Sequence, residues 1–131
     1  MKFHHIGIAT SNIDELIKKI SKFMEITEKS EIIYDELQDA NLCMITLSDG
    51  MKLELIQGKV VENIVKKHQY LYHTCYSVKD IVSTKEELIK DGAFLVREEL
   101  PAILFNNRRV AFLMWNLGLI ELVEDENDGV N

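Results

Sequence analysis

The pattern of apolar and polar positions predicts two similar β-hairpins, one in each half of the chain. In residues 42–57, two apolar runs flank the dipeptide Asp49-Gly50, which is a strong signal for a hairpin turn. In residues 110–124, two apolar runs again flank a short turn. The second strand of each hairpin contains one acid among apolar neighbours, Glu54 in the first and Glu121 in the second.

Each hairpin is preceded by a strand, a helix and a further strand. The first helix begins after the N-cap Asn12, and apolar residues recur at helical spacing as far as Met24. The second helix begins after Asp80 and ends at Gly92, with Ile81, Leu88 and Ile89 as its apolar face. The predicted strands are 5–9, 31–34, 42–47, 51–57, 70–78, 93–98, 108–114 and 117–124, with a helical turn in 58–69 and a loop at 100–107.

This order of elements is an internal repeat. From His5 to Glu54 is 54 − 5 = 49 positions, and from His73 to Glu121 is 121 − 73 = 48 positions, so each half begins with a histidine strand and ends with a glutamate strand. The repeat predicts an α+β fold of two paired βαβββ modules, forming a curved eight-stranded sheet with a concave inner face and the helices outside. We expect one domain over residues 1–131, with modules at about 2–57 and 70–124, a connector at 58–69 and a polar tail at 125–131.

Charge and composition narrow the function classes. The net charge of −7 and the lack of a basic block exclude nucleic acid and anionic membranes as expected partners. No apolar run has transmembrane length, and no signal peptide is evident, so we expect a cytoplasmic protein. Cys43 and Cys75 lie in predicted strands without a CxxC motif, and we expect reduced thiols that serve packing.

The repeated histidine and glutamate are the candidate chemistry. Strand alternation places Gly7 and Ala9 on the same side as His5, and Cys75 and Ser77 on the same side as His73, which leaves room for a ligand. A carboxylate inside an apolar strand is costly to bury without a partner. Each of the four side chains can be satisfied separately, but the repeat favours one shared set of two imidazoles and two carboxylates. Such a set suits a divalent ion, and Co, Ni, Mn, Zn, Mg and Fe remain open.

Four motifs resemble those of the vicinal oxygen chelate superfamily of glyoxalases, bleomycin resistance proteins and dioxygenases. They are His5–Ala9, Lys52–Ile56, Tyr72–Val78 and the hairpin from Val110 to Glu124, and the resemblance spans about residues 2–124. Methylmalonyl-CoA epimerases are the most similar group, followed by lactoylglutathione lyase (glyoxalase I). The resemblance implies a glyoxalase-like fold with His5, Glu54, His73 and Glu121 as metal ligands. It also places Glu36, in the acidic loop before the first hairpin, as a candidate base.

The leading hypothesis is a metal-dependent isomerase or epimerase that removes a proton next to a carbonyl of a small substrate such as an acyl-CoA or another thioester. Glu121, Glu54 or Glu36 would be the general base, and Arg108-Arg109 could meet a phosphate or carboxylate. A glyoxalase I-type lyase is the first alternative. An iron-dependent dioxygenase needs only one carboxylate, so Glu54 counts against it; a non-catalytic binding protein is the remaining alternative. A homodimer is expected.

Overall fold

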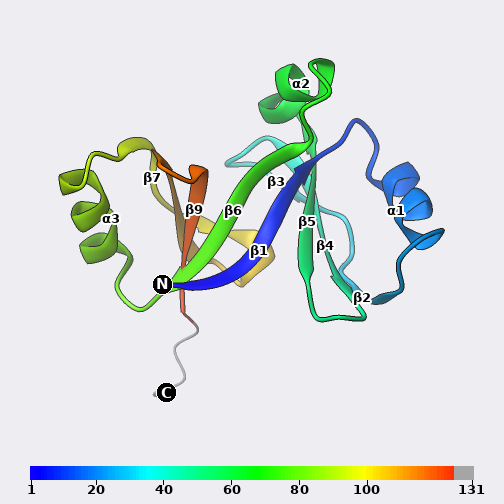
Figure 1. Cartoon of the computed structure of the whole chain (residues 1–131), viewed down its shortest axis with the longest axis horizontal. Coiled ribbons are helices and arrows are strands. Elements are labelled where there is room, and N and C mark those ends of the chain that lie inside the picture. Colours follow the sequence, from blue (N-terminus) through cyan, green and yellow to red (C-terminus); the bar gives the residue numbers. More distant parts are fainter. Residues whose placement is uncertain (126–131) are drawn as a thin grey trace. The chain divides into compact units, whose positions relative to one another are not determined.

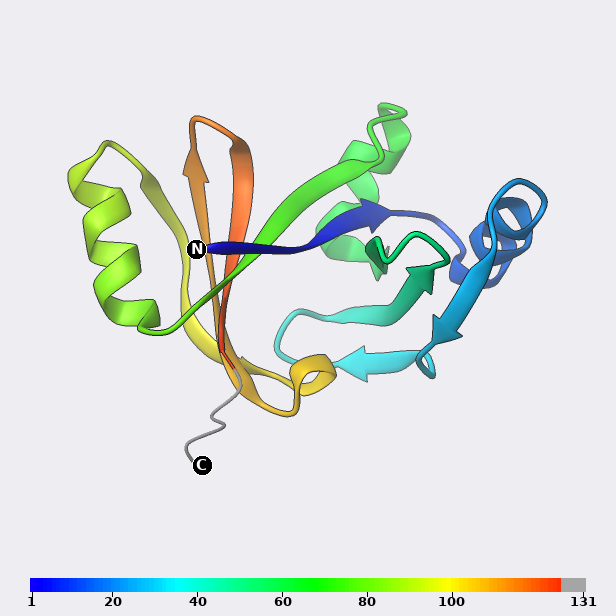
Figure 2. The same cartoon turned by 60° about the horizontal axis from the view of Figure 1, so that its bottom comes forward.

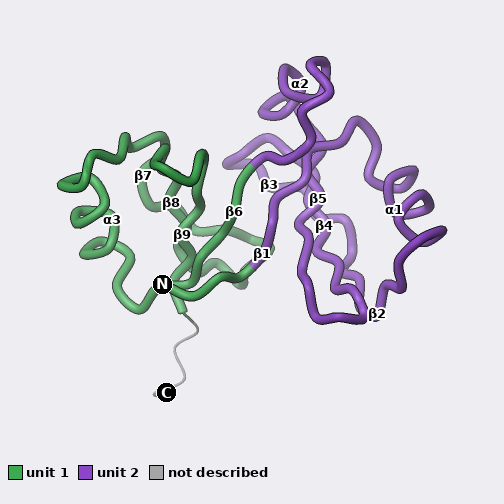
Figure 3. Tube along the Cα trace, viewed as in Figure 1, with its two compact units in different colours: residues 1–4, 73–131 green, residues 5–72 purple. Residues whose placement is uncertain are grey.

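The computed structural model describes residues 1–125, and the chain divides into two compact units (Figure 3). Unit 2 comprises residues 5–72, and unit 1 comprises residues 1–4 together with the chain from residue 73 onward. The divisions fall inside the strands β1 (Lys2–Ala9) and β6 (Leu71–Val78). Each unit is of the α+β class, with a helix packed on a mixed sheet, so the predicted fold class is confirmed.

Unit 2 contains the strand, helix and hairpin order predicted for the first half. Its strands pair in the order β2-β4-β5-β1, with β3 also paired to β4. Only β1 and β5 run parallel, because the helix α1 and the intervening strands return the chain to the same edge. The remaining elements are α1 (Ile13–Ser21), β2 (Ile26–Lys29), β3 (Ile33–Asp35), β4 (Ala40–Leu47), β5 (Lys52–Gly58) and α2 (Lys59–Lys66).

The helix α1 begins as predicted but ends earlier. The Asn12 side chain accepts a hydrogen bond from the Glu15 backbone N–H at 3.0 Å, which is the expected N-cap. The predicted continuation to Met24 is wrong, since the helix ends at Ser21 and Phe23 is 86% exposed. The chain instead forms β2, whose mostly exposed residues carry no apolar alternation that would predict a strand. The strand predicted at 31–34 is the shorter β3, shifted toward the hairpin.

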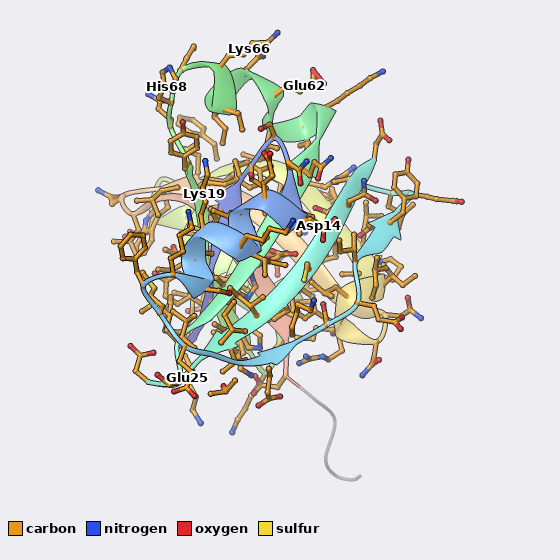
Figure 4. The ribbon with its side chains drawn as sticks, turned by 90° about the vertical axis from the view of Figure 1, so that its right-hand side faces the viewer. Asp14, Lys19, Glu25, Glu62, Lys66 and His68 are labelled. Atoms are coloured by element: carbon orange, nitrogen blue, oxygen red, sulfur yellow. The ribbon has the colours of Figure 1, made fainter. Side chains whose placement is uncertain are left out.

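Both helices of unit 2 are amphipathic. In α1, Ile13 is buried and Leu16, Ile17 and Ile20 pack against the β4–β5 core around Ile45 and Leu55. The outer faces carry charged residues, including Asp14 and Lys19 on α1 and Glu62 and Lys66 on α2 (Figure 4). Between residues 1 and 125, no helix is both long and apolar enough to cross a membrane.

Unit 1 repeats the same plan. The strands pair in the order β6-β9-β8-β7, and β6 runs parallel to β9. The elements are β6, α3 (Ile81–Lys90), β7 (Phe94–Ala102), a 3₁₀ turn at Ile103–Phe105, β8 (Arg108–Trp115) and β9 (Gly118–Glu124). The helix α3 covers one face of this sheet (Figures 1 and 2), burying a core of Val78, Ile81, Leu88, Ala93, Ala111, Leu113, Ile120 and Leu122.

Two predictions for unit 1 are corrected by the structure. The loop predicted at 100–107 is wrong at its start, because β7 continues to Ala102 and pairs with β8. The predicted apolar position Ile89 is 40% exposed, and the mostly apolar inner face of α3 instead includes Lys85. The Lys85 Nζ donates to Glu99 Oε2 of β7 at 2.7 Å, and this partner compensates the burial of the ammonium group. Residues 126–131 of the predicted polar tail lie outside the described part of the chain.

The pair between Lys85 and Glu99 predicts a pH-dependent contribution to stability. The hydrogen bond from Lys85 lowers the pKa of Glu99 below its usual value. Because the pKa is lower in the folded state, the stabilisation is complete above the unfolded-state pKa of about 4.3 and is lost as the pH falls through the folded-state pKa. We therefore expect Glu99→Gln to lower Tm at pH 7 and the difference from the wild type to shrink below about pH 4.

Thermal melts of both proteins across that pH range check this expectation. Glu98→Gln is the matched control, since its carboxylate lies 3.8 Å from Lys85 Nζ and is 71% exposed. A Glu98→Gln effect as large as that of Glu99→Gln, or a Glu99→Gln effect independent of pH, would contradict the assignment.

Candidate functional site

In unit 2, the parallel pairing of β1 and β5 brings His5 next to Glu54. The strands are in register with Gly7 opposite Glu54, and His5 lies two residues before Gly7 on the same face. The His5 Nε2 and Glu54 Oε1 atoms are 3.1 Å apart, and both side chains are almost fully buried. The opposite face of β5 carries Leu53 and Leu55, which pack in the core beneath α1. The pair therefore lies on the face away from the helix.

In unit 1, β6 and β9 make the same arrangement with His73 and Glu121. Here Cys75 is opposite Glu121, and His73 lies two residues before Cys75. The His73 Nε2 and Glu121 Oε1 atoms are also 3.1 Å apart, and both side chains are buried. In each unit, therefore, the residue opposite the glutamate is the second residue after the histidine. The sequence repeat corresponds to a repeat in strand register.

The surroundings of the second pair are strongly apolar. Phe112 of β8 is directly opposite Glu121, and its ring meets the His73 ring edge-on at 5.4 Å between centroids. In unit 2 the residue across from Glu54 is Met44. A carboxylate among such neighbours needs a hydrogen-bond partner or a cation, because burying an uncompensated charge is expensive. In unit 2 the His5 imidazole is within hydrogen-bond distance of Glu54. In unit 1 the His73 Nε2 and Glu121 Oε1 atoms are in ion-pair contact at 3.1 Å.

The donor atoms of each pair fit a divalent metal ion. An imidazole nitrogen and a carboxylate oxygen are both common ligands, at about 2.0–2.2 Å from the ion. Two ligands at that distance, separated by an angle of roughly 90–110°, lie about 3.0–3.5 Å apart. The 3.1 Å between nitrogen and oxygen in each pair falls in this range, so neither pair needs rearrangement to hold an ion.

The structure does not bring Glu36 next to the His5–Glu54 pair. Glu36 is exposed in the turn after β3, just beyond Asp35, which is opposite Ala40 of β4. Ala40 in turn is opposite Gly58, which is four residues along β5 from Glu54. That offset is about 13 Å along the strand direction. The role of Glu36 as a base stays a prediction from the resemblance.

The other chemically active side chains occupy structural positions. His4 meets the ring of Phe105 edge-on, and the His68 ring lies 3.0 Å from the Tyr70 hydroxyl. The Cys43 thiol is buried and donates to the Ser30 carbonyl, and burial raises its pKa. The sequence analysis missed Phe112, although counting back from the turn at Asn116 along both strands would have placed it opposite Glu121.

The fold and the repeated pairs agree with a comparison against protein-family models. Residues 4–112 match the model described as Glyoxalase/Bleomycin resistance protein/Dioxygenase superfamily. The chain belongs to this superfamily, and the resemblance inferred from the sequence is confirmed. Members of the superfamily bind small molecules, often with a divalent metal ion, and some are not catalytic. A comparison with curated proteins gives no match.

Solved structures of similar fold include two methylmalonyl-CoA epimerases. The enzyme from Mycobacterium tuberculosis is 19% identical, with 98% of this chain and 91% of that chain covered at a TM-score of 0.76. A second methylmalonyl-CoA epimerase is also 19% identical, covering 95% and 94% with a TM-score of 0.68. A hypothetical protein from Bacillus halodurans C-125 is 20% identical, covering 95% and 94% at 0.73. At these identities the likeness concerns the fold.

Proposed function

We propose that this protein is a metal-dependent isomerase or epimerase that moves a proton at the carbon next to a carbonyl, with methylmalonyl-CoA epimerase-like activity. The observation that supports it is the repeated His–Glu pair, built on one parallel strand pair in each unit with the same register. A purely structural role would require only that each carboxylate be satisfied. It would not require the same nitrogen–oxygen arrangement twice at matching positions.

The proposed ligands are His5, Glu54, His73 and Glu121, acting together on one ion in a single domain formed by residues 1–131. Co, Ni, Mn, Zn and Mg are the candidate ions. When bound, such an ion supplies Lewis-acid stabilisation of negative charge on a substrate oxygen. The two imidazoles and two carboxylates would hold such an ion and leave room for a substrate oxygen.

The chain's own residues would handle the proton. In an epimerase, one of Glu54 and Glu121, loosened from the ion, would accept the proton from one face of the substrate carbon, and a protonated acid on the opposite face would donate a proton there; in a glyoxalase, the same carboxylate would return the proton to the neighbouring carbon. The paired imidazole holds the carboxylate in position at 3.1 Å. Burial of these side chains strengthens their electrostatic effect on the reacting group, because water does not screen it.

The alternatives make different demands on the same residues. A dioxygenase of this superfamily would use iron with two histidines and one carboxylate, so Glu54 would be surplus. A binding protein would not need buried carboxylates beside both histidines. The proposal includes a small-molecule substrate, such as an acyl-CoA or another thioester, and a cytoplasmic homodimer.

Metal binding should stabilise the fold. At an ion concentration a hundred times Kd, mass action adds about 2.7 kcal/mol, which corresponds to a rise in Tm of roughly 5–10 °C. We expect this rise with at least one ion of a series of Mg²⁺, Mn²⁺, Co²⁺, Ni²⁺ and Zn²⁺, measured after chelator treatment. Glu54→Gln and Glu121→Gln should each weaken the response, because each removes a ligand charge. Glu62→Gln makes the same change on the exposed face of α2 and should respond like the wild type.

Proton transfer should be visible as exchange with solvent. We expect the metal-loaded protein in heavy water to introduce deuterium into one substrate of a panel of methylmalonyl-CoA, other 2-substituted acyl-CoA thioesters and the glutathione hemithioacetal of methylglyoxal. Loss of a general base lowers the rate by about 10²–10⁴-fold, so the variant of Glu54 or Glu121 that removes the base should be nearly inactive. Mass spectrometry of the recovered substrate measures the uptake.

The variants separate the candidate bases. Glu36→Gln should slow exchange only if Glu36 takes the proton, and Glu62→Gln serves as the control for removing one acidic charge. Absence of deuterium in every substrate, from protein shown to bind an ion, would argue for an oxygenase or a binding protein instead.

A further inference from the structure

Three apolar side chains form a row across one face of the unit 1 sheet. Leu119 of β9 is directly opposite Met114 of β8, and Met114 is directly opposite Phe94 of β7. Directly opposed residues in an antiparallel sheet project from the same face. We call Leu119, Met114 and Phe94 the apolar row. It crosses three strands, which is about 10 Å between the outer backbones, and it ends at the edge of the sheet.

The apolar row begins beside the His73–Glu121 pair. Glu121 is two residues after Leu119 on β9, so both side chains project from the same face. Thr74 of β6 is in register with Ile120 of β9, which puts His73, one residue earlier, level with Leu119. The apolar row therefore continues the line of a candidate metal ligand across the sheet, on the face away from α3.

The apolar row becomes more exposed with distance from His73. Leu119 is half-buried, whereas Met114 and Phe94 are 43% and 73% exposed. Single exposed apolar residues are ordinary, but a contiguous exposed patch is typical of a binding surface. Here the exposed side chains adjoin each other and lead to a buried imidazole. Such a surface suits a flexible apolar chain that has one end at the His73–Glu121 pair.

The opposite face of the β8–β9 hairpin is held by α3. Trp115, next to Met114, packs against the core beneath α3, and its indole N–H donates to the Asp91 carboxylate at 3.1 Å. Alternation along β8 then directs Met114 away from α3. Because these contacts fix the backbone under the apolar row, a ligand that binds there has little backbone to order.

The edge of this sheet is poorly suited to pairing with a second copy of the chain. Leu95 of β7 is opposite Leu113 and Arg97 is opposite Phe112, so Val96 is one extra residue in β7. The three residues after Val96 are all charged. A bulge and charged side chains on an edge strand both oppose pairing with another strand. The apolar row therefore fits a small ligand better than a further strand.

The two arginines predicted to meet a substrate anion already have acceptors within the protein. Arg108 donates to the carbonyl oxygens of Phe105 at 3.2 Å and Glu124 at 2.9 Å, and Arg109 donates to the Glu124 carboxylate at 2.6 Å. Both arginines lie at the other end of β8 from Met114. What the apolar row offers a ligand is therefore apolar contact.

We propose that the apolar row binds an alkyl chain of the substrate, so that the protein prefers acyl thioesters whose acyl chain extends several carbons beyond the reacting carbon. This inference rests on the proposed function, because it places the reacting carbon beside the His73–Glu121 pair. Each methylene that is buried against the row is removed from water, and this stabilises the complex roughly in proportion to the apolar area covered.

A series of thioesters of increasing chain length tests the proposal. The probes are the N-acetylcysteamine thioesters of 2-methylbutanoic, 2-methylhexanoic and 2-methyloctanoic acid, titrated calorimetrically into metal-loaded and metal-free protein. We expect each added methylene to tighten binding by about two- to fourfold. Met114→Thr and Phe94→Thr should each weaken binding of the longest thioester by about five- to tenfold and leave binding of the shortest within about twofold.

Unit 2 offers matched controls. Phe23 and Met24 are both exposed just beyond the end of α1. Phe23→Thr and Met24→Thr remove the same side chains from another surface and should bind all three thioesters like the wild type. Met114→Leu keeps an apolar side chain of similar size and should retain the dependence on chain length. Phe94→Thr, at the edge of the sheet, decides the matter if Met114→Thr does not fold.

Several outcomes would overturn the proposal. They are equal binding of the three thioesters by the wild type, no binding of any of them, and an equal loss in Phe23→Thr and Phe94→Thr. Sedimentation velocity of the same variants tests the other occupant, a second copy of the chain. A dimer that dissociates in Phe94→Thr but not in Phe23→Thr, with an unchanged dependence on chain length, would make the apolar row a subunit interface instead.

The deuterium exchange assay keeps this inference separate from the proposed function. Exchange in methylmalonyl-CoA, without any dependence of binding on chain length, would leave the function standing and reject the role of the apolar row. Binding that depends on chain length and on Met114, without exchange in any substrate, would support the apolar row as a recognition surface and reject the proposed reaction.

Discussion

The arrangement of this protein depends on burying a carboxylate in a parallel strand pair and compensating it with an imidazole. Glu54 and Glu121 each lie among apolar strand residues, where an isolated charge would be costly. Parallel pairing with the strand that opens each module puts a histidine nitrogen 3.1 Å from each carboxylate. Once that register is fixed, the helix must cover the opposite face, because alternation turns Leu53, Leu55, Ile120 and Leu122 toward it.

The two units share this plan but differ in what surrounds the pair. In unit 2, Gly7 lies opposite Glu54 and has no side chain that would take up space beside the carboxylate. In unit 1, the side chains of Cys75 and Phe112 lie on the two strands that flank Glu121. Unit 1 also has irregularities in β7 on both sides of Arg97. The first irregularity turns Arg97 to the face that carries the histidine. At the second, Glu98 and Glu99 together lie opposite a single residue of β8, and Glu99 accepts a hydrogen bond from Lys85 of α3.

Much of this could be predicted from the sequence, because its local patterns act through short-range geometry. The turn at Asp49-Gly50 and the alternation around Glu54 define a hairpin with one buried acid, and the near-equal spacing from His5 to Glu54 and from His73 to Glu121 reveals the repeat. The caps Asn12 and Asp80 start the helices as expected, since capping involves only the next three residues. Membership of the superfamily followed from the same motifs and is confirmed by the family model.

Other features were decided only by tertiary structure. The polar strand β2 exists because β4 offers it a free edge, and its residues have no apolar alternation that would announce a strand. Lys85 can be buried on the inner face of α3 because Glu99 of β7 forms an ion pair with its ammonium group. The face of Arg97 depends on one extra residue in β7, and a bulge is visible only once the partner strand is in place. Sequence alone determined which residues alternate; pairing between strands decided which of them meet, because register is a property of two strands and not of one.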